Sequence, residues 1–357
     1  MLSVSDKMDS RKILAVVIVI IVAAASAGII YAVLNHNDTG ELKVAYLKKN
    51  GYETLMVAEE KGFFNDAGIK IDSVPVTGSG QNSVNALLAG EVDIAATGQG
   101  PVAATLKDYL DDTVIVCAVN YSTGGQVWVS KAGTGLTAYN GSNAADVKSS
   151  FQSFVDTNGR PVNLGVQQGA TTESEIKGWL KLMEIPFADF GASTDGKLVK
   201  LVNQKANMLV TDLDHGDIDV MAASQPFPSN AIANVTGSYV IGSNKDTSSY
   251  DVACYITTKA IYDEKKDLIE KFIKGLDLAS KYMADPANND ECVSICTEII
   301  GTNTETVQAA FDIANWKVDW SDAMAHTLFE TCKKKGISVD EQTCRDKCLF
   351  KDYIATL

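Results

Sequence analysis

The chain has 357 residues, 46% of them hydrophobic and 21% charged, and a formal net charge of −14. This is the composition of a globular protein, and the length allows one to three domains. An acidic chain without a cluster of Lys and Arg is not expected to bind nucleic acid, because contacts with phosphates need concentrated positive charge.

An apolar segment near the N-terminus predicts a membrane anchor. Residues 13–34 carry no charge and are enough to cross a bilayer as a helix at roughly 1.5 Å per residue. Positive residues in 1–12 favour a cytoplasmic tail, which places the rest of the chain outside the cell. A cleaved signal peptide is the alternative, but the apolar run continues beyond its small residues and favours an uncleaved anchor. Residues 35–41 are then a linker, and we expect a single-pass protein of the cell membrane whose soluble part faces outside.

Beyond residue 41, strand-like and helix-like segments alternate in two series. The first series has strands expected at 42–47, 69–76, 92–97 and 113–119, with helices at 53–64 and 82–90. The second has strands expected at 162–167, 197–202 and 217–223, with helices at about 172–183 and 204–214. This alternation predicts an α/β fold of two lobes, each a mostly parallel sheet flanked by helices.

One short motif occurs once in each series. The stretch "GEVDIAATGQGP" (90–101) is followed 126 positions later by "GDIDVMAASQPF" (216–227). Both run through Gly, an acid, a β-branched residue, Asp and a second β-branched residue, and both reach Gln and Pro soon afterwards. We interpret the two stretches as the same strand-end corner, one in each lobe.

The last third of the chain differs from the two series. A strand-like segment at 250–258 precedes an amphipathic helix at 263–285. A single strand followed only by helices does not build a third sheet, so we expect the chain to return to its first lobe. The predicted domains are lobe 1 at 42–120 and 250–357, with a helical Cys-bearing C-terminal extension, and lobe 2 at 121–249.

Polar loops follow four of the predicted strands, at 46–52, 97–101, 167–173 and 224–227. In open parallel sheets, ligands bind beyond the C-terminal ends of strands and near helix N-termini, which favour anionic or strongly polar groups. Two such loops from each lobe predict a ligand site in a cleft between the lobes. For any single loop, an ordinary turn between a strand and a helix is the alternative.

The chain shows no catalytic, cofactor or metal motif that we can assign. It has three His and contains no Gly-x-Ser-x-Gly, no phosphate loop and no His-Glu-x-x-His. The acidic stretch "DLDHGDID" (212–219) lacks the spacing of a calcium-binding loop. We therefore expect a binding protein, not an enzyme, without a cofactor or a bound metal.

The seven cysteines fall into two groups. Cys117 and Cys254 lie in apolar strand patterns and are expected to be buried thiols, with a mutual disulfide as the alternative. Outside the membrane, the other five predict disulfides that staple the C-terminal part; they are Cys292, Cys296, Cys332, Cys344 and Cys348. A thiolate metal or iron–sulfur site is the alternative, although Cys-x3-Cys is not its usual spacing.

The chain resembles ABC-transporter substrate-binding proteins of the sulfonate, nitrate and taurine type, a group that includes the NMT1/THI5-like proteins. The likeness lies in "AEEKGFFNDAGIKI" (58–71) and "ALLAGEVDIA" (86–95), and it continues through "VNLGVQQGATTE" (162–173) and "GDIDVMAASQPF". It covers about residues 42–325. The family usually has an aromatic or acidic residue before its Pro-Phe pair, where this chain has Gln225.

The resemblance implies a two-lobed type II periplasmic-binding fold that closes around a ligand and delivers it to a membrane permease driven by an ATPase. The hinge would lie near 119–126 and 244–252. The expected ligand is a small polar or anionic molecule of the sulfonate, nitrate or taurine kind. Binding of a thiamine-pyrimidine precursor and a role as a surface ligand sensor are the alternatives. By position, the implied ligand contacts are Tyr46, Lys48, Gly98, Gln99, Gly100, Gln168, Gly169, Thr171, Thr172, Gln225 and Phe227.

Overall fold

The computed structural model describes residues 40–357 apart from residue 248. The predicted cytoplasmic tail and transmembrane anchor lie outside the described residues. Within them, no helix is both long enough and apolar enough to cross a membrane.

The first of two sheets, sheet A, is built from the beginning and the end of the described chain. Its strand order is β12-β4-β11-β3-β1-β2. The strands are β1 (Glu41–Leu47), β2 (Lys70–Val76), β3 (Ile94–Gly98), β4 (Thr113–Ser122), β11 (Asp251–Thr258) and β12 (Ala314–Asp319). β1 pairs with β3 in parallel, whereas β11 runs antiparallel to both of its neighbours.

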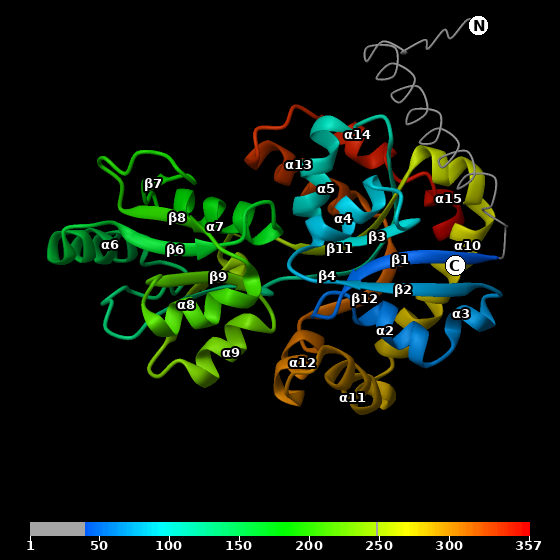
Figure 1. Ribbon diagram of the computed structural model, residues 1–357, viewed down its shortest axis with the longest axis horizontal. Helices are drawn as coiled ribbons and strands as arrows, with labels where there is room; N and C mark the ends of the chain where they lie inside the picture. Colours follow the sequence, from blue (N-terminus) through cyan, green and yellow to red (C-terminus); the bar gives the residue numbers. More distant parts are fainter. Residues whose placement is uncertain (1–39, 248) are drawn as a thin grey trace, which may run out of the picture. The chain divides into compact units, whose positions relative to one another are not determined.

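Helices cover both faces of sheet A. They are α2 (Glu53–Glu60), α3 (Phe63–Asp66), α4 (Gly80–Leu88), α5 (Gln99–Asp108), α10 (Lys259–Ala284), α11 (Asn289–Ile300), α12 (Thr304–Phe311), α13 (Asp322–Lys334), α14 (Glu341–Asp346), α15 (Lys351–Ile354) and the 3-10 turn η3 (Pro286–Asn288). Figure 1 shows α4, α5 and α13 on one face and α2, α11 and α12 on the other. The C-terminal helices thus pack around the sheet that the N-terminal strands begin.

The second sheet, sheet B, is built from the middle of the chain, with strand order β10-β5-β9-β6-β8-β7. Its strands are β5 (Gln126–Ser130), β6 (Val162–Val166), β7 (Phe187–Ala188), β8 (Val199–Asn203), β9 (Val220–Ser224) and β10 (Tyr239–Ser243). Its helices are α6 (Ala144–Asn158), α7 (Thr171–Leu182), α8 (Leu209–His215) and α9 (Phe227–Asn234), with the 3-10 turns η1 (Ala206–Met208) and η2 (Asn244–Thr247).

Apolar side chains fix which helices lie on which face of sheet B. Phe151 of α6 and Trp179 of α7 are fully buried in one cluster with the strands. Leu209 and Leu213 of α8 are fully buried in a second cluster with Ala231 of α9. Because burying a large apolar side chain stabilises the fold by about 1.5–3 kcal/mol, these anchors hold one helix pair on each face. The α/β fold class predicted from the sequence is confirmed.

The repeated motif has the same structural role in both sheets. Asp93 accepts a hydrogen bond from the Lys43 amide at 2.9 Å, and Asp219 accepts one from the Asn163 amide at 2.8 Å. In each case the backbone amide of the Asp donates in return to the carbonyl of the same partner residue at 2.9 Å. The conserved position of these carboxylates within the two motifs therefore ties β3 to β1 and β9 to β6.

Several elements differ from the sequence prediction. The helix expected at 53–64 is two helices, because Gly62 adopts a left-handed conformation with φ of 76° between them. The C-terminal part is not only helical, since β12 pairs antiparallel with β4 at the edge of sheet A. β5 and β10 were not expected either, and they form one side of sheet B. β10 and β12 lie at sheet edges, whereas β5 lies between β10 and β9.

The predicted disulfides are wrong, because all seven cysteines are buried free thiols. Cys292 and Cys296 lie one turn apart on α11, where neighbouring Cβ atoms are about 5–6 Å apart and too distant for a disulfide. Cys348 packs instead against β4, through a bridge of its backbone with Ile115. No group of three or more metal-ligating side chains capable of holding a metal occurs between residues 40 and 357, residue 248 aside.

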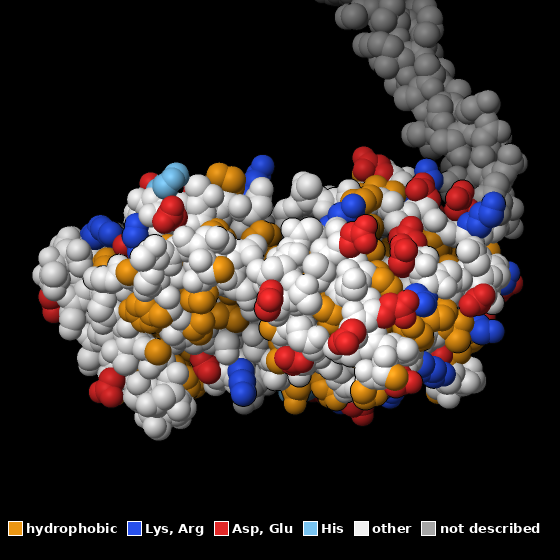
Figure 2. All heavy atoms as spheres, turned by 90° about the horizontal axis from the view of Figure 1, so that it is seen from below, with side chains coloured by type: hydrophobic (Ala, Val, Ile, Leu, Met, Phe, Trp, Pro, Cys, Tyr) orange, Lys and Arg blue, Asp and Glu red, His pale blue; other side chains and the backbone are white. Residues whose placement is uncertain are grey.

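Charged side chains are dispersed over the face seen in Figure 2. Acidic and basic side chains alternate there with apolar ones, most densely over the part built on sheet A. On this face the negative net charge is not gathered into one patch.

Candidate functional site

A pocket with a volume of about 110 Å³ is lined by residues from both sheets. Sheet A contributes the ends of β3 and β4, the loop that follows β1 and the N-termini of α4 and α5, and β11 contributes its first residues. Sheet B contributes the start of β5, the N-terminus of α7 and the end of β9. Polar and charged lining residues include Lys49, Asn50, Glu53, Ser79, Thr97, Gln99, Asn120, Ser122, Gln126, Thr171, Thr172, Ser224, Gln225 and Asp251.

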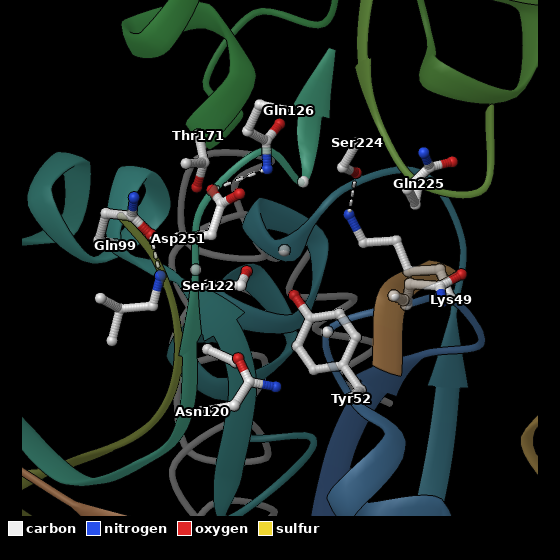
Figure 3. A pocket seen from close by; sticks show the side chains of 18 of the residues that line it. Lys49, Tyr52, Gln99, Asn120, Ser122, Gln126, Thr171, Ser224, Gln225 and Asp251 are labelled. Carbon is white, nitrogen blue, oxygen red and sulfur yellow. Dashed lines mark hydrogen bonds between the residues drawn. The ribbon is translucent and has the colours of Figure 1, made fainter. Parts of the chain in front are cut away.

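Aromatic side chains add apolar surface to this lining. Tyr52 and Trp316 both line the pocket, and Tyr52 is buried with 4% of its surface exposed. Figure 3 shows the Tyr52 ring directed into the same space as the side chains of Asn120 and Ser122. The site therefore offers a ligand both hydrogen-bonding groups and an aromatic face.

Lys49 reaches from sheet A to sheet B. Its Nζ donates a hydrogen bond to Ser224 Oγ at the end of β9, at 3.0 Å (Figure 3). The ammonium also lies over the Tyr52 ring, 5.9 Å from the ring centroid. Burial lowers the pKa of Lys49, although the negative charges of Asp251 and Glu53 oppose this effect. Lys49 is thus a basic group at the pocket wall whose charge is poorly solvated.

Two carboxyl groups line the same pocket. Burial raises the pKa of Glu53 to about 7, although hydrogen bonds from backbone amides favour its charged form. Burial also raises the pKa of Asp251 to about 7, and the negative charge of Glu175 adds to this rise. Carboxyl groups with a pKa near neutrality are characteristic of functional sites, where burial and neighbouring charges are arranged around a ligand or a reaction.

Polar side chains join the two segments by which the chain passes between the sheets. The Gln126 side chain donates to Asp251 Oδ1 at 2.9 Å and accepts a hydrogen bond from the Thr172 hydroxyl. Asn244 Oδ1 accepts from the amides of Gly124 and Gln126, and its amide group donates to Asp251 Oδ2 at 3.2 Å. The network fixes the start of β5 beside the start of β11, next to the pocket.

Two glycines allow the N-termini of α5 and α7 to approach closely. The Gly100 amide donates to Thr171 Oγ1 at 3.1 Å. A Cβ atom at Gly100 would lie 2.5 Å from Thr171 Cα, and one at Gly98 would lie 2.7 Å from Thr171 Oγ1. Because real Cβ atoms do not come this close to a backbone atom, glycine at position 100 is required by this contact between the sheets.

The structure brings about half of the implied ligand contacts into the pocket. Gly98, Gln99, Thr171, Thr172 and Gln225 line it. The amide group of Gln99 is occupied, since it donates to the Tyr250 carbonyl at 2.8 Å and accepts from the Val252 amide at 3.0 Å.

The other implied contacts do not line this pocket. Tyr46 and Phe227 pack in the hydrophobic clusters of the two sheets. Lys48 is exposed, and Gln168 is exposed and bonded to Asn203. The Gly169 amide donates to Glu173 at 2.6 Å, and Gly100 contacts Thr171 as described above.

Sequence reasoning missed the residues that start and end the crossing strands. Ser122 ends β4, Gln126 starts β5 and Asp251 starts β11, and all three line the pocket. Asp251 is a polar residue at the start of an apolar strand-like segment, which could have marked it as a site residue. The sequence of such a segment does not indicate, however, which strands lie where the chain crosses between the lobes. Of the adjacent lysines, it is Lys49 rather than Lys48 that faces the pocket.

The described lining contains amides, hydroxyls, two carboxyls and one amine, and neither His nor Cys. Such a set can orient a small polar molecule by hydrogen bonds.

Comparison with solved structures supports the fold. The periplasmic aliphatic sulphonate binding protein SsuA from Escherichia coli has a TM-score of 0.65 at 14% identity, covering 88% of this chain and 98% of that one. The periplasmic nitrate-binding protein NrtA from Synechocystis PCC 6803 has a TM-score of 0.69 at 16% identity, covering 89% and 88%. The desulfurization enzyme DSZB has a TM-score of 0.60 at 14% identity, covering 88% and 98%. The fold is therefore shared by binding proteins and an enzyme.

Sequence comparison gives the family. No curated protein matches the chain. The model of the NMT1-like family matches residues 35–297, which is more than half of the chain. It spans every strand described above except β12, and it includes both copies of the repeated motif. The chain belongs to the NMT1-like family.

Proposed function

We propose that this chain is the extracytoplasmic solute-binding component of an ABC importer and that it holds a small polar ligand in the pocket between sheets A and B. The observation that carries this proposal is the position of the pocket, which is lined by both sheets at the point where two segments cross between them. A ligand there contacts lobe 1 (42–120 and 250–357) and lobe 2 (121–249) together, which makes lobe closure depend on ligand.

Similar structures support the same proposal. Two of them are a sulphonate-binding and a nitrate-binding periplasmic protein. We propose accordingly that a permease and an ATPase receive the ligand from this chain, and that residues 13–34 hold it at the outer face of the cell membrane. Fractionation of cells that produce the full chain tests the last point, which fails if the protein is released in soluble form.

We propose a binding role rather than catalysis, although DSZB shows that an enzyme can have this fold. The lining amides and hydroxyls of this chain are groups that orient a ligand. A chemically unchanged ligand after incubation and release from the protein is the expected result. Recovery of a converted product at more than a stoichiometric amount would contradict this role.

A thermal-shift screen of the full-length chain tests the ligand proposal. The compounds are sulfonates, nitrate, bicarbonate, taurine and pyrimidine precursors, and a ligand at 100 times its Kd should stabilise the folded chain by about 2.7 kcal/mol. If no compound raises the melting temperature, the proposed solute-binding role loses its support.

Two variants then test the site. Ser122→Ala removes a hydroxyl from the pocket wall, and the expected result is an affinity about two- to twelvefold weaker for a compound identified in the screen, since a lost hydrogen bond costs about 0.5–1.5 kcal/mol. Gln168→Ala is the matched control, because this implied contact lies outside the pocket. The reverse pattern would place the ligand elsewhere.

A further inference from the structure

The three charged side chains that line the pocket do not pair with one another. They are Lys49, Glu53 and Asp251. Within residues 40–357, residue 248 aside, no salt bridge of 4.0 Å or less joins Lys49 to either carboxylate, and Lys49 Nζ donates to Ser224 Oγ instead. Opposite charges in a partly desolvated space attract strongly, so something in the structure holds these groups apart.

Each charge is held by a different neutral partner. Asp251 is fixed by the side chains of Gln126 at 2.9 Å and Asn244 at 3.2 Å. Lys49 is drawn to the opposite sheet by Ser224. In Figure 3, Asp251 and Lys49 stand on opposite sides of the space into which Ser122 and Tyr52 point. The pocket is therefore dipolar, with a negative wall and a positive wall.

Glu53 adds a second negative group with spare acceptor capacity. Its Oε2 accepts from the Gly51 amide at 2.7 Å, and only 1% of the residue is exposed. The Asn50 amide lies beside the carboxylate and favours its charged form, but its geometry does not complete a hydrogen bond to Oε1. Thr97, fully buried, presents a hydroxyl that likewise has no hydrogen-bond partner in the described residues. Buried acceptors of this kind call for a donor.

The balance of charge disfavours a ligand that is only an anion. Lys49 is the one base among the described lining residues, against the two acids Glu53 and Asp251. Glu175, which is paired with Lys334, adds a negative charge behind Asp251. A simple anion would neutralise the charge of Lys49, but it would also be repelled by the two carboxylates. Burial is the main cause of the raised pKa of both acids, and for Asp251 the negative charge of Glu175 adds to it.

We infer that the ligand of this pocket carries a basic nitrogen, protonated in the bound state, which lies against Asp251 and Glu53 while Lys49 and Ser224 receive a polar or negative part of the same molecule. This inference rests on the proposed solute-binding role and names the chemical class of the solute. A protonated amine or amidine donates hydrogen bonds to carboxylates and adds the missing charge, which makes each bond stronger than a neutral one.

Matched pairs of compounds test the inference. The full-length chain is titrated with small polar molecules in pairs that differ only by an amino or a hydroxyl group, such as 2-aminoethanesulfonate with 2-hydroxyethanesulfonate and 4-aminobutyrate with 4-hydroxybutyrate. The expected result is that compounds which raise the melting temperature are amino members, with affinities at least tenfold above those of their hydroxyl partners. Equal or tighter binding of the hydroxyl members would overturn the inference and leave the proposed binding role intact. If no member of any pair binds while nitrate or bicarbonate does, the inference fails and the proposed binding role stands.

The pH dependence of the same titration is a second measurement that needs no variant. The titratable groups that interact with Asp251 are Lys49, Tyr52 and, from α7, Glu175, while Glu53 lines the same pocket. Because the carboxylates must be charged to hold a cation, affinity for an amino compound should rise at least threefold between pH 5.5 and pH 8. A ligand whose affinity instead falls over this range is held as an anion by Lys49, and the inference is then wrong.

Variants locate the nitrogen. Asp251→Asn keeps the shape of the side chain and should reduce the preference for amino over hydroxyl members at least fivefold, and Glu53→Gln should do so in part. Asp72→Asn changes an exposed carboxylate on β2 and should leave the preference unchanged. If Asp251→Asn and Glu53→Gln both fold and both retain the full preference, the nitrogen does not lie against these acids.

Discussion

At the scale of single residues, the pocket contains charges that a protein interior ordinarily avoids. Removing a carboxylate from water disfavours its charged form, and this cost explains why the pKa values of Glu53 and Asp251 rise to about 7. A buried carboxyl group of this kind lowers the free energy of unfolding of the ligand-free protein at pH values above the ordinary pKa of the group. Such a loss is common at binding sites, where stability and function make opposing demands on the same residue.

Replacement of Asp251 should therefore stabilise the ligand-free chain, and most strongly at alkaline pH. The pKa of Asp251 is about 7 in the folded chain against 3.8 for the free side chain, so its contribution to stability is full below pH 3.8 and is lost as pH rises through 7. Asp251→Asn removes this loss, and we expect a gain of roughly 1–3 kcal/mol in the free energy of unfolding at pH 8. Chemical denaturation at pH 8 measures it.

A measurement at a second pH shows whether the stability gain of Asp251→Asn comes from removing the buried charge or from a change that does not depend on pH. At pH 4.5 the wild-type carboxyl is mostly protonated when folded, so the gain should shrink to a small part of its value at pH 8. The exposed control Asp72→Asn should show no such difference. An equal change in stability at both pH values would mean that burial of the charge is not the cause.

At the scale of elements, helix α7 of sheet B packs against two helices of sheet A. Its N-terminus meets α5 through the contact of Thr171 with Gly100. Farther along α7, the buried carboxylate of Glu175 accepts from Lys334 at the end of α13, at 3.4 Å, and Lys334 also donates to Ser249 Oγ at 3.0 Å. Both contacts join the two sheets beside the pocket, so they hold the arrangement in which one ligand touches both.

Gly100→Ala should weaken ligand binding without weakening the fold. The new Cβ would lie 2.5 Å from Thr171 Cα, which forces the two helices apart, whereas alanine itself favours a helix over glycine by about 1 kcal/mol. We expect affinity for a compound found in the screen to fall at least tenfold, and the melting temperature of the ligand-free chain to stay unchanged or rise. Isothermal titration and thermal unfolding measure the two quantities.

Gly178→Ala is the matched control for this prediction. It makes the same substitution within α7, where the nearest atom to the new Cβ would be Lys334 Cε at an ordinary 3.6 Å. Its affinity should equal that of the wild type. If Gly100→Ala binds as tightly as this control, the close contact of α5 with α7 does not belong to the ligand-bound state.

At the scale of the described part of the chain, the two sheets are joined by two short segments, one between β4 and β5 and one between β10 and β11. Asn244 and Asp251 link these segments through Gln126 and Gly124. Relative movement of two domains is expected to concentrate in such a pair of connections. The hinge predicted from the sequence near 119–126 and 244–252 remains a prediction.

Hydrogen exchange tests this hinge. Addition of a compound that binds should slow amide exchange in 123–126 and 244–251 and at the N-termini of α5 and α7, because closure around the ligand suppresses local opening. Exchange in the buried middle of α10 should not change, since this helix packs only within lobe 1. Protection spread evenly over α10 and the crossing segments would contradict a hinge.

The sequence predicts features that depend on neighbouring residues better than features that depend on contacts between distant parts of the chain. The strands β1, β2, β3, β6 and β8 lie close to their predicted positions, because apolar runs between Gly-rich turns are local signals. β5, β10 and β12 escaped prediction, since they become strands through pairing with β4 and β9 or with each other, which the local sequence does not determine. Similarly, Gln99 and Thr172 were expected at the site because they follow strands, while Gln126 was not.

The sequence by itself determined the α/β class, the two related halves and the family, because these depend on periodicity, turn residues and a motif that occurs twice. Only the tertiary structure decided that Lys49 rather than Lys48 faces the pocket, that the cysteines are free thiols, and that Asp251 meets Glu53 and Lys49 across the same space. These residues lie up to 202 positions apart, and no local sequence pattern predicts that they line the same pocket. Their distances follow from the pairing of β11 with β3 and β4, a consequence of the whole fold.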